Sequence, residues 1–523
     1  MVLMTMPTLK PRSIAFVSLG CPKNTIDSEQ MLGTLTEAGF ELVDAEANAD
    51  AVIINTCGFL EASKQESLDV INQAIERKKE GKIQRVVVTG CLVQRHRARL
   101  LEWAPDIDAL LGVFDRDHIL EAVTAPDTER ETLTEQEPPY WIAGNALQAA
   151  KARGMSTVGL TVHGKDGKGI GYFEDESQRR RLTPRHWAYL RISEGCNQGC
   201  AFCTIPSIRG KMRSKPLNRI ADEARRLMQD GAFELNLIGQ DTTSYGMDIG
   251  YDNLDHPQAE GLIGLLRTLD EVATEFGGGW MRLMYAYPSF FTDSMIDAIA
   301  HFPNIVKYID IPLQHSTDSM LTAMRRRISA DDQLTLMNKL RERIDGLAIR
   351  TTLITGFPGE TEADHESLCD FVREFQFDML GVFKYSREPG TPAGTMDLDP
   401  KLHVPDEIKE AREAELMLIQ QEIAFENAEF LAQEECQFDV LIDTPSQAIE
   451  LDGQKAAADP QFMSTGRCYH QAPQVDSSTC VLSREELPAG SLVRATIVGS
   501  DGYDLIARPT DDLSPDIALP LLS

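Results

Sequence analysis

Three cysteines stand close together near the middle of the chain. Cys196, Cys200 and Cys203 have the spacing C-x3-C-x2-C and follow an apolar run over 187–192 that predicts a β-strand. Cysteine thiolates at such short loop spacings hold iron–sulfur clusters. Three of them can ligate three irons of a [4Fe–4S] cluster, which leaves the fourth iron open for a small molecule. The alternative is a zinc ion with a distant fourth ligand, although zinc sites more usually show C-x2-C pairs at both ends.

Three further cysteines each follow a short, β-branched apolar run in the N-terminal part of the chain. They are Cys21, Cys57 and Cys91, and the runs cover 14–19, 51–56 and 85–90. Continuous runs of this kind indicate strands buried on both faces. Because helical patterns follow two of them, we expect a doubly wound parallel sheet whose carboxyl edge gathers the three thiols. They are candidate ligands of a second metal cluster; the alternative is that they are ordinary buried residues at strand ends.

The alternation of strands and helices resumes in the centre of the chain. Six candidate strands cover 188–192, 234–238, 282–285, 307–311, 349–354 and 379–384. Six strands are fewer than the eight of a closed (β/α)8 barrel, so we expect an open (β/α)6 barrel. Beyond a long amphipathic helix over 404–435, short runs separated by turns predict a small β-barrel.

The expected fold class is therefore α/β, in three domains. We expect an N-terminal doubly wound parallel sheet over 1–130, a central open (β/α)6 barrel over 186–435 and a small C-terminal β-barrel over 436–510. The segment 131–185, rich in charge and glycine, is expected to be a linker or an insertion.

The cysteine motifs resemble those of a known enzyme family. C-x3-C-x2-C after a first barrel strand is similar to the radical S-adenosylmethionine (SAM) enzymes, and I-P-x-x-R-G over 205–210 resembles their methylthiotransferase branch. The motifs S-L-G-C-P-K-N, N-T-C-G-F and T-G-C-L, which contain the N-terminal cysteines, resemble the N-terminal domain of that branch. The resemblance implies a radical SAM barrel in the centre and a TRAM-like β-barrel at the end.

The same resemblance implies the cofactors, which are two [4Fe–4S] clusters and SAM. Cys196, Cys200 and Cys203 would hold the cluster that cleaves SAM to methionine and a 5′-deoxyadenosyl radical. The three N-terminal cysteines would hold a second cluster that handles sulfur. An electron donor such as flavodoxin or ferredoxin is implied as a partner.

Polar residues gather at the ends of the predicted barrel strands, where barrel enzymes place their active sites. Gln240 and Gly356 are candidate SAM-binding residues on this ground. The family often carries G-x-I-x-G-x-x-E on its fifth strand. Here Thr352 replaces the first glycine and Gly359 occupies the glutamate position, with Glu360 one residue later.

Other chemically capable residues have structural alternatives. His315 is either a proton donor or a capping or hydrogen-bonding residue, and Cys369 in a helical run is expected to be a core residue. Arg325–Arg327 is expected to be a solvated face. The remaining cysteines are expected to be structural or incidental: Cys436, Cys468 and Cys480.

Composition limits the class of protein and its partners. The chain has 523 residues, a hydrophobic content of 42% that supports substantial cores, and a net charge of −30. An acidic surface repels phosphates and attracts basic proteins, so a nucleic acid is not expected as the direct substrate. No signal peptide or membrane-spanning run of ~20 apolar residues is predicted, and the cysteine pattern favours a reducing cytoplasm.

The C-terminal region also bears on the substrate. The run G-R-x-x-x-x-A-P-x-x-D over 466–476 resembles the methylthiotransferases that act on ribosomal protein uS12. The resemblance implies that a methylthio group is added to the β-carbon of an aspartate of uS12. Two alternatives remain open: a methylthiotransferase of transfer RNA adenosine, and a non-catalytic iron–sulfur scaffold whose clusters are fully ligated by protein.

Overall fold

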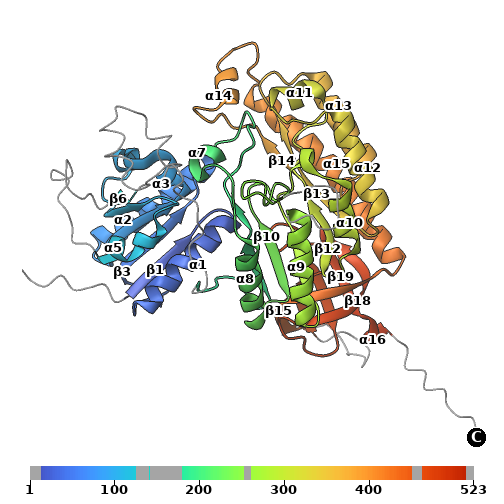
Figure 1. Cartoon of the computed structure of the whole chain (residues 1–523), viewed down its shortest axis with the longest axis horizontal. Coiled ribbons are helices and arrows are strands. Elements are labelled where there is room, and N and C mark those ends of the chain that lie inside the picture. Colours follow the sequence, from blue (N-terminus) through green and yellow to red (C-terminus); the bar gives the residue numbers. More distant parts are fainter. Residues whose placement is uncertain (1–12, 125–139, 142–178, 252–260, 450–461, 514–523) are drawn as a thin grey trace, which may run out of the picture.

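The protein folds into two parallel sheets and a closed β-barrel (Figure 1). The computed structural model describes residues 13–124, 140–141, 179–251, 261–449 and 462–513. None of the helices within these ranges is both long and apolar enough to span a bilayer.

The N-terminal domain is a six-stranded parallel sheet with the order β2-β1-β3-β4-β5-β6. Its strands are β1 (Ser13–Ser18), β2 (Glu41–Val43), β3 (Ala49–Thr56), β4 (Ile83–Gly90), β5 (Ala109–Leu111) and β6 (Tyr140–Trp141). Its helices are α1 (Pro22–Glu37), α2 (Glu61–Lys79), α3 (Cys91–His96), α4 (Leu100–Trp103) and α5 (Ile119–Thr124).

Both faces of this sheet are covered. Val52 and Ile54 of β3 belong to one apolar cluster and Ile53, between them, belongs to another, because successive side chains of a strand point to opposite faces. This explains why the run reads as continuously apolar. β6 lies within 131–185, so this segment contributes a strand to the sheet as well as connecting two domains.

The central domain is the expected open barrel of six parallel strands in sequential order. Its strands are β7 (Trp187–Arg191), β10 (Glu234–Ile238), β11 (Trp280–Leu283), β12 (Ile305–Asp310), β13 (Ala348–Thr355) and β14 (Met379–Lys384). A two-stranded hairpin of β8 (Ser193–Glu194) and β9 (Arg213–Ser214) follows the first strand. The helices are α7 (Ile205–Arg209), α8 (Leu217–Gln229), α9 (Leu262–Glu275), α10 (Asp293–His301), α11 (Asp318–Ala323), α12 (Ala330–Arg343), α13 (Glu362–Phe375), α14 (Pro392–Met396) and α15 (Asp406–Gln433).

The C-terminal domain is a closed five-stranded barrel with the order β15-β16-β17-β19-β18. Its elements are β15 (Gln437–Ala448), β16 (Phe462–Arg467), β17 (Thr479–Ser483), β18 (Leu492–Asp501), β19 (Asp504–Pro509) and α16 (Thr510–Leu513). β16 was not expected from the sequence, and without it the barrel could not close. After Phe462 and Met463 it continues with Ser464, Thr465, Gly466 and Arg467, none of which is an apolar residue that marks a strand.

The C-terminal barrel docks on the amino ends of the central strands. Arg467 pairs with Glu234 at the start of β10 at 2.5 Å, and Asp476 accepts hydrogen bonds from Tyr308 and Arg350 at 2.8 and 3.2 Å. Arg467 and Asp476 belong to the G-R-x-x-x-x-A-P-x-x-D run. In the structure these two residues therefore hold the domains together.

Candidate cofactor and substrate cavity

A cavity of about 400 Å³ lies between the N-terminal sheet and the carboxyl ends of the central strands. The N-terminal domain contributes Cys21, Lys23, Cys57, Phe59, Leu60 and Cys91 to its lining. The central domain contributes Phe202, Ile205, Ile208, Arg209, Gln240, Tyr285, Pro312, Gln314, Thr352, Ile354, Phe383, Lys384, Tyr385 and Ser386. The two domains thus enclose one shared site.

The N-terminal cysteine triad lies where the strand order reverses. The order β2-β1-β3 places the switch point between β1 and β3, and ligands of open α/β sheets bind at such a point. Cys21 follows β1, Cys57 follows β3 and Cys91 begins α3 directly after β4. Gly20, with φ +96°, permits the close approach, because a Cβ there would lie 2.9 Å from Cys57 Cβ. The structure therefore brings these three predicted residues together on one cavity wall.

The central triad lies on the loop after β7 and β8. Its backbone already donates to sulfur: Gln198 N–H donates to Cys196 Sγ at 3.3 Å, and Ile205 N–H donates to Cys203 Sγ at 3.4 Å. Such bonds favour a thiolate and tune the potential of a bound cluster. Phe202, between the last two cysteines of the motif, lines the cavity, so this loop faces the N-terminal triad across it.

Most of these thiols are protonated when no metal is bound. Burial raises the pKa of Cys57, and it raises the pKa of Cys91, Cys196 and Cys203 to about 12. Cluster ligands must be thiolates, so metal binding releases these protons and the metal supplies the compensating charge. The donor sets, all sulfur and sheltered from water, fit iron–sulfur clusters.

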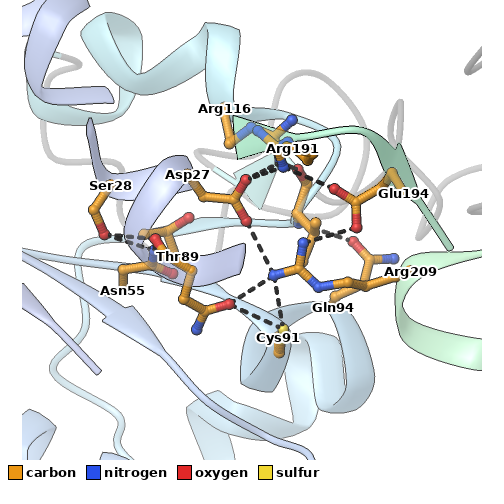
Figure 2. A network of polar contacts seen from close by, with 12 residues as sticks. Asp27, Ser28, Asn55, Thr89, Cys91, Gln94, Arg116, Arg191, Glu194 and Arg209 are labelled. Carbon is orange, nitrogen blue, oxygen red and sulfur yellow. Dashed lines mark hydrogen bonds and ion pairs between the residues drawn. The ribbon is translucent and has the colours of Figure 1, made fainter. Parts of the chain in front are cut away.

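Arg209, in the I-P-x-x-R-G motif that follows the central triad, contacts the N-terminal triad, and Figure 2 shows it beside Cys91. It lies six residues after Cys203, and its Nη2 donates to Cys91 Sγ at 3.4 Å. Its guanidinium also pairs with Asp27 at 3.0 Å and with Glu194 at 2.9 Å. The same two carboxylates pair with the buried Arg191, at 2.7 and 2.8 Å. Arg209, which is close in sequence to the central triad, is thereby held against the N-terminal triad.

The buried network also joins the two domains. Asp27 lies on α1, whereas the central hairpin carries Glu194 and the preceding strand carries Arg191. Arg116 of the N-terminal domain adds a third cation on Asp27 at 2.8 Å. The N-terminal and central domains are therefore held in register by paired charges that water does not reach.

Arg326 corrects one expectation. Arg325 and Arg327 are exposed as predicted, but Arg326 is only 5% exposed and its Nη1 donates to Cys200 Sγ at 3.4 Å. Its guanidinium also lies 4.2 Å from the ring centroid of Tyr287. The solvated-face interpretation was wrong for this residue because the turn after α11 points the middle arginine of the run inward.

The predicted SAM-binding residues differ in their placement. Gln240 lines the cavity; its Nε2 donates to Glu194 at 3.2 Å, whereas its buried Oε1 has no hydrogen-bond partner among the described residues. Such an orphaned acceptor fits a bound ligand. Gly356 instead donates its N–H to Glu360 and packs against Lys409 of α15, outside the described lining.

His315 and Cys369 lie outside the described lining as well. The Nδ1 of the fully buried His315 accepts N–H bonds from Ser316 and Thr317, at 2.9 and 3.2 Å, so its hydrogen-bonding interpretation is the one the geometry favours. Cys369 is a buried core residue of α13, as expected.

Two residues of the cavity have a backbone held in the left-handed region, which the sequence does not indicate. Tyr285 and Gln314 both line the cavity and have φ values of +59° and +77°. Non-glycine residues rarely adopt this conformation, and they persist where the surroundings enforce it, often at functional sites. No local sequence pattern marks such positions.

Lys23 was also missed, although it lies inside a quoted motif. Its side chain is buried, and Nζ lies 2.9 Å from the centroid of the Tyr285 ring. Burial lowers its pKa to about 8, which still leaves it a cation at neutral pH. Lysine is usually exposed, so the sequence gives no indication of this placement.

Three family models match the chain in the order of its three domains. Residues 13–112 match the family described as uncharacterized protein family UPF0004, residues 190–372 match the radical SAM superfamily, and residues 437–509 match the TRAM domain. Among solved structures, the radical SAM methyltransferase TsrM from Kitasatospora setae is 16% identical, with a TM-score of 0.49 over 73% of this chain and 77% of that one.

Relatives of known name cover almost the whole chain. A protein of Anaeromyxobacter sp. (strain K) is 38% identical over 491 residues, which is 94% of this chain and 92% of the relative. One from Lachnoclostridium phytofermentans is 38% identical over 493 residues, 94% of this chain and 99% of the relative. Both are named ribosomal protein uS12 methylthiotransferase RimO. The chain therefore belongs to the RimO family of radical SAM methylthiotransferases, enzymes that use SAM and a [4Fe–4S] cluster.

Proposed function

We propose that this enzyme adds a methylthio group to the β-carbon of an aspartate in ribosomal protein uS12. The observation that carries the proposal is that the N-terminal triad and Phe202, which lies within the central cysteine motif, line one cavity into which a single side chain could reach. The names of the relatives supply the substrate. The acidic chain, with its net charge of −30, would attract a basic ribosomal protein.

We infer that the chain holds two [4Fe–4S] clusters. Cys196, Cys200 and Cys203 would ligate the one that works with SAM, and the N-terminal triad would ligate the second. When bound, these groups would supply the radical that breaks an unreactive C–H bond, together with the sulfur and methyl group that replace the hydrogen.

The chain's own residues would shelter this chemistry. Phe59, Leu60 and Phe202 present apolar surface to the cavity, which keeps water from a reactive carbon. Gln240, with its unpartnered Oε1, is proposed to bind SAM. Gly356 is proposed only to shape the loop after β13, since its N–H is engaged by Glu360.

The proposal extends to partners and compartment. A radical SAM cluster must be reduced, so we propose flavodoxin or ferredoxin as the electron donor. Clusters held by thiolates suit a reducing environment, which places the enzyme in the cytoplasm.

The direct test is the mass of uS12 after reaction. The protein is reconstituted anaerobically with iron and sulfide, then mixed with SAM, a reductant and purified uS12. We expect a gain of about 46 Da on one aspartate, the mass of S–CH3 replacing H, and about eight irons per chain. Cys57→Ala and Cys200→Ala should each abolish the gain and retain about four irons. The matched control is Cys480→Ser, in the C-terminal barrel and outside both triads, which should leave both measurements unchanged.

Each of the other outcomes would contradict one part of the proposal. If 5′-deoxyadenosine forms but uS12 stays unmodified, the substrate is wrong and transfer RNA is tested next. If eight irons are present and SAM is not cleaved, the scaffold interpretation replaces the enzyme. If either cysteine variant retains all its iron, the ligand assignment is wrong for that triad.

A further inference from the structure

The charge of the cavity is opposite to that of the whole chain. The chain carries a net charge of −30, yet the described lining residues include Lys23, Arg209 and Lys384 and no aspartate or glutamate. A cavity of this sign inside an acidic protein concentrates anions. The question is which of the three cations is available to a ligand.

Two of them are already neutralised by carboxylates. Arg209 pairs with Asp27 and Glu194 at 3.0 and 2.9 Å. Lys384 has a side chain that is 40% exposed, and it lies 3.2 Å from Glu410 and 3.8 Å from a second glutamate of α15. The charge of Arg209 therefore stabilises the domain interface, and the charge of Lys384 is paired at the surface of the central barrel.

Lys23 differs from both. It is 5% exposed, and among the described residues no carboxylate oxygen lies within 4.0 Å of its Nζ. Its described partner is the face of the Tyr285 ring, which attracts a cation but does not neutralise it. Cys21, Asp310 and Glu194 favour its charge, but neither carboxylate is in direct contact with it. A buried ammonium that no anion contacts is costly, so a site of this kind is completed by an anionic ligand.

The position of Lys23 decides what that ligand is. Lys23 lies in the first turn of α1, two residues after Cys21, and its Nζ reaches across the interface to Tyr285 at the carboxyl end of β11. The ammonium therefore stands beside the N-terminal triad and faces the barrel mouth. An anion bound there would lie in the space where the reacting carbon must also lie.

We propose that Lys23 binds the carboxylate of the side chain that is modified, so that the cavity selects an acidic residue. The inference rests on the proposed function and deepens it, because it names the group that distinguishes an aspartate from a neutral substrate. A charge-assisted hydrogen bond in a water-poor cavity is strong and directional. The Tyr285 ring, fixed by its left-handed backbone and by the N–H it donates to Asp310 at 3.1 Å, holds the ammonium in place before substrate arrives.

The test compares two enzymes on two substrates. The enzymes are wild type and Lys23→Met, which keeps the length of the stem and removes the charge. The substrates are uS12 and uS12 in which the aspartate modified by wild type is replaced by asparagine. We expect wild type to prefer the aspartate form by about 10- to 100-fold in kcat/KM, the value of one charge-assisted hydrogen bond. In Lys23→Met this preference should disappear, because kcat/KM should fall for the aspartate form of uS12 and stay unchanged for the asparagine form.

Three controls separate substrate binding from other roles. Lys23→Arg keeps the charge and should retain part of the preference. Lys64→Met removes a lysine that also lies over an aromatic ring, 4.4 Å from the centroid of Trp103 but outside the described lining, and should change nothing. Iron content and 5′-deoxyadenosine formation without substrate should equal wild type in all three variants.

The other outcomes overturn the inference. If Lys23→Met keeps the aspartate preference, another group binds the carboxylate. If Lys23→Met lowers kcat/KM equally for both substrates, or if the variant loses iron, the role of Lys23 is to support the cluster or the fold. If wild type modifies no form of uS12, the proposed function falls first and this inference falls with it, so the two failures are distinguishable.

Discussion

At the scale of single residues, each cysteine triad receives a hydrogen bond from one buried arginine. Arg209 donates to Cys91 and Arg326 donates to Cys200, each at 3.4 Å. Hydrogen bonds to ligand sulfurs and nearby positive charge stabilise the reduced, more negative state of a cluster. With the cysteines as the proposed ligands, these arginines would be positioning residues that act through the ligands and would tune the two sites separately.

Arg326→Met should make the cluster at the central triad harder to reduce. The variant loses both the donor to Cys200 and a buried positive charge, so its reduction potential should be more negative, and less 5′-deoxyadenosine should form at a fixed reductant potential. A redox titration followed by electron paramagnetic resonance measures this. The reduction potential of Arg326→Lys should lie between those of wild type and Arg326→Met. Arg325→Met, at the exposed neighbour, should have the potential of wild type. An unchanged potential in Arg326→Met would show that the contact has no electronic effect.

These residues show which parts of the site can be predicted from the sequence and which cannot. The six cysteines follow from spacing and from the ends of apolar runs. The arginine and lysine contacts do not, because they connect helices and strands far apart in the chain: Arg209 and Cys91 are 118 residues apart. Lys23, of the N-terminal domain, contacts the Tyr285 ring of the central domain. Such contacts depend on how domains dock, which periodicity does not encode.

At the scale of elements, the strands next to the cysteines are predictable and the edges are not. The run 51–56 is β3 (Ala49–Thr56), and its continuous apolar character reflects burial on both faces. The three-residue edge strand β2 leaves no comparable pattern. Edge strands are short and half-covered, so their side chains need not be apolar.

The helix that follows the barrel's fifth strand has a complete capping box. Thr361 accepts from the Asp364 N–H, and the Asp364 side chain accepts from the Thr361 N–H at 3.0 Å. This box sets where the loop over 355–360 ends and α13 begins. The loop carries Gly356 and Glu360, so the cap also helps to fix the hydrogen bond between these two residues.

Thr361→Ala should therefore destabilise the protein by about 1 kcal/mol. The variant leaves one N–H of the first turn without its acceptor, and urea unfolding followed by circular dichroism measures the loss. Thr361→Ser, which keeps the hydroxyl, should restore most of it. A stability equal to wild type in Thr361→Ala would mean that water replaces the cap at no cost.

At the scale of the whole molecule, charged interfaces hold the three domains together, and two of them enclose the cavity. The N-terminal domain meets the central domain through Asp27 and its arginines, and the C-terminal barrel meets it through Arg467 and Asp476 at the opposite ends of the strands. Figure 1 shows the C-terminal barrel beneath the central strands and the N-terminal sheet beside them. The barrel thus lies away from the cavity, which suits a role in support or in docking of the substrate protein.

His470 makes this second interface sensitive to acid. It packs against Phe438, with ring centroids 4.7 Å apart, and burial together with the nearby Arg282 lowers its pKa from 6.5 to about 4. The unfolded chain therefore binds a proton more readily than the folded one in this range. The contribution of the neutral ring to stability is complete above pH 6.5 and is lost as the pH falls toward about 4.

His470→Gln should consequently flatten the decline in stability between pH 6.5 and pH 5. Glutamine does not titrate there, so the difference in unfolding free energy between the variant and wild type should shrink as the pH falls. Urea unfolding at a series of pH values, followed by tryptophan fluorescence, gives the two curves. The matched control is His301→Gln at the exposed end of α10, which should leave the slope unchanged. Parallel curves for His470→Gln and wild type would show that this ring is protonated equally in both states, and that the barrel's docking depends on its ion pairs alone.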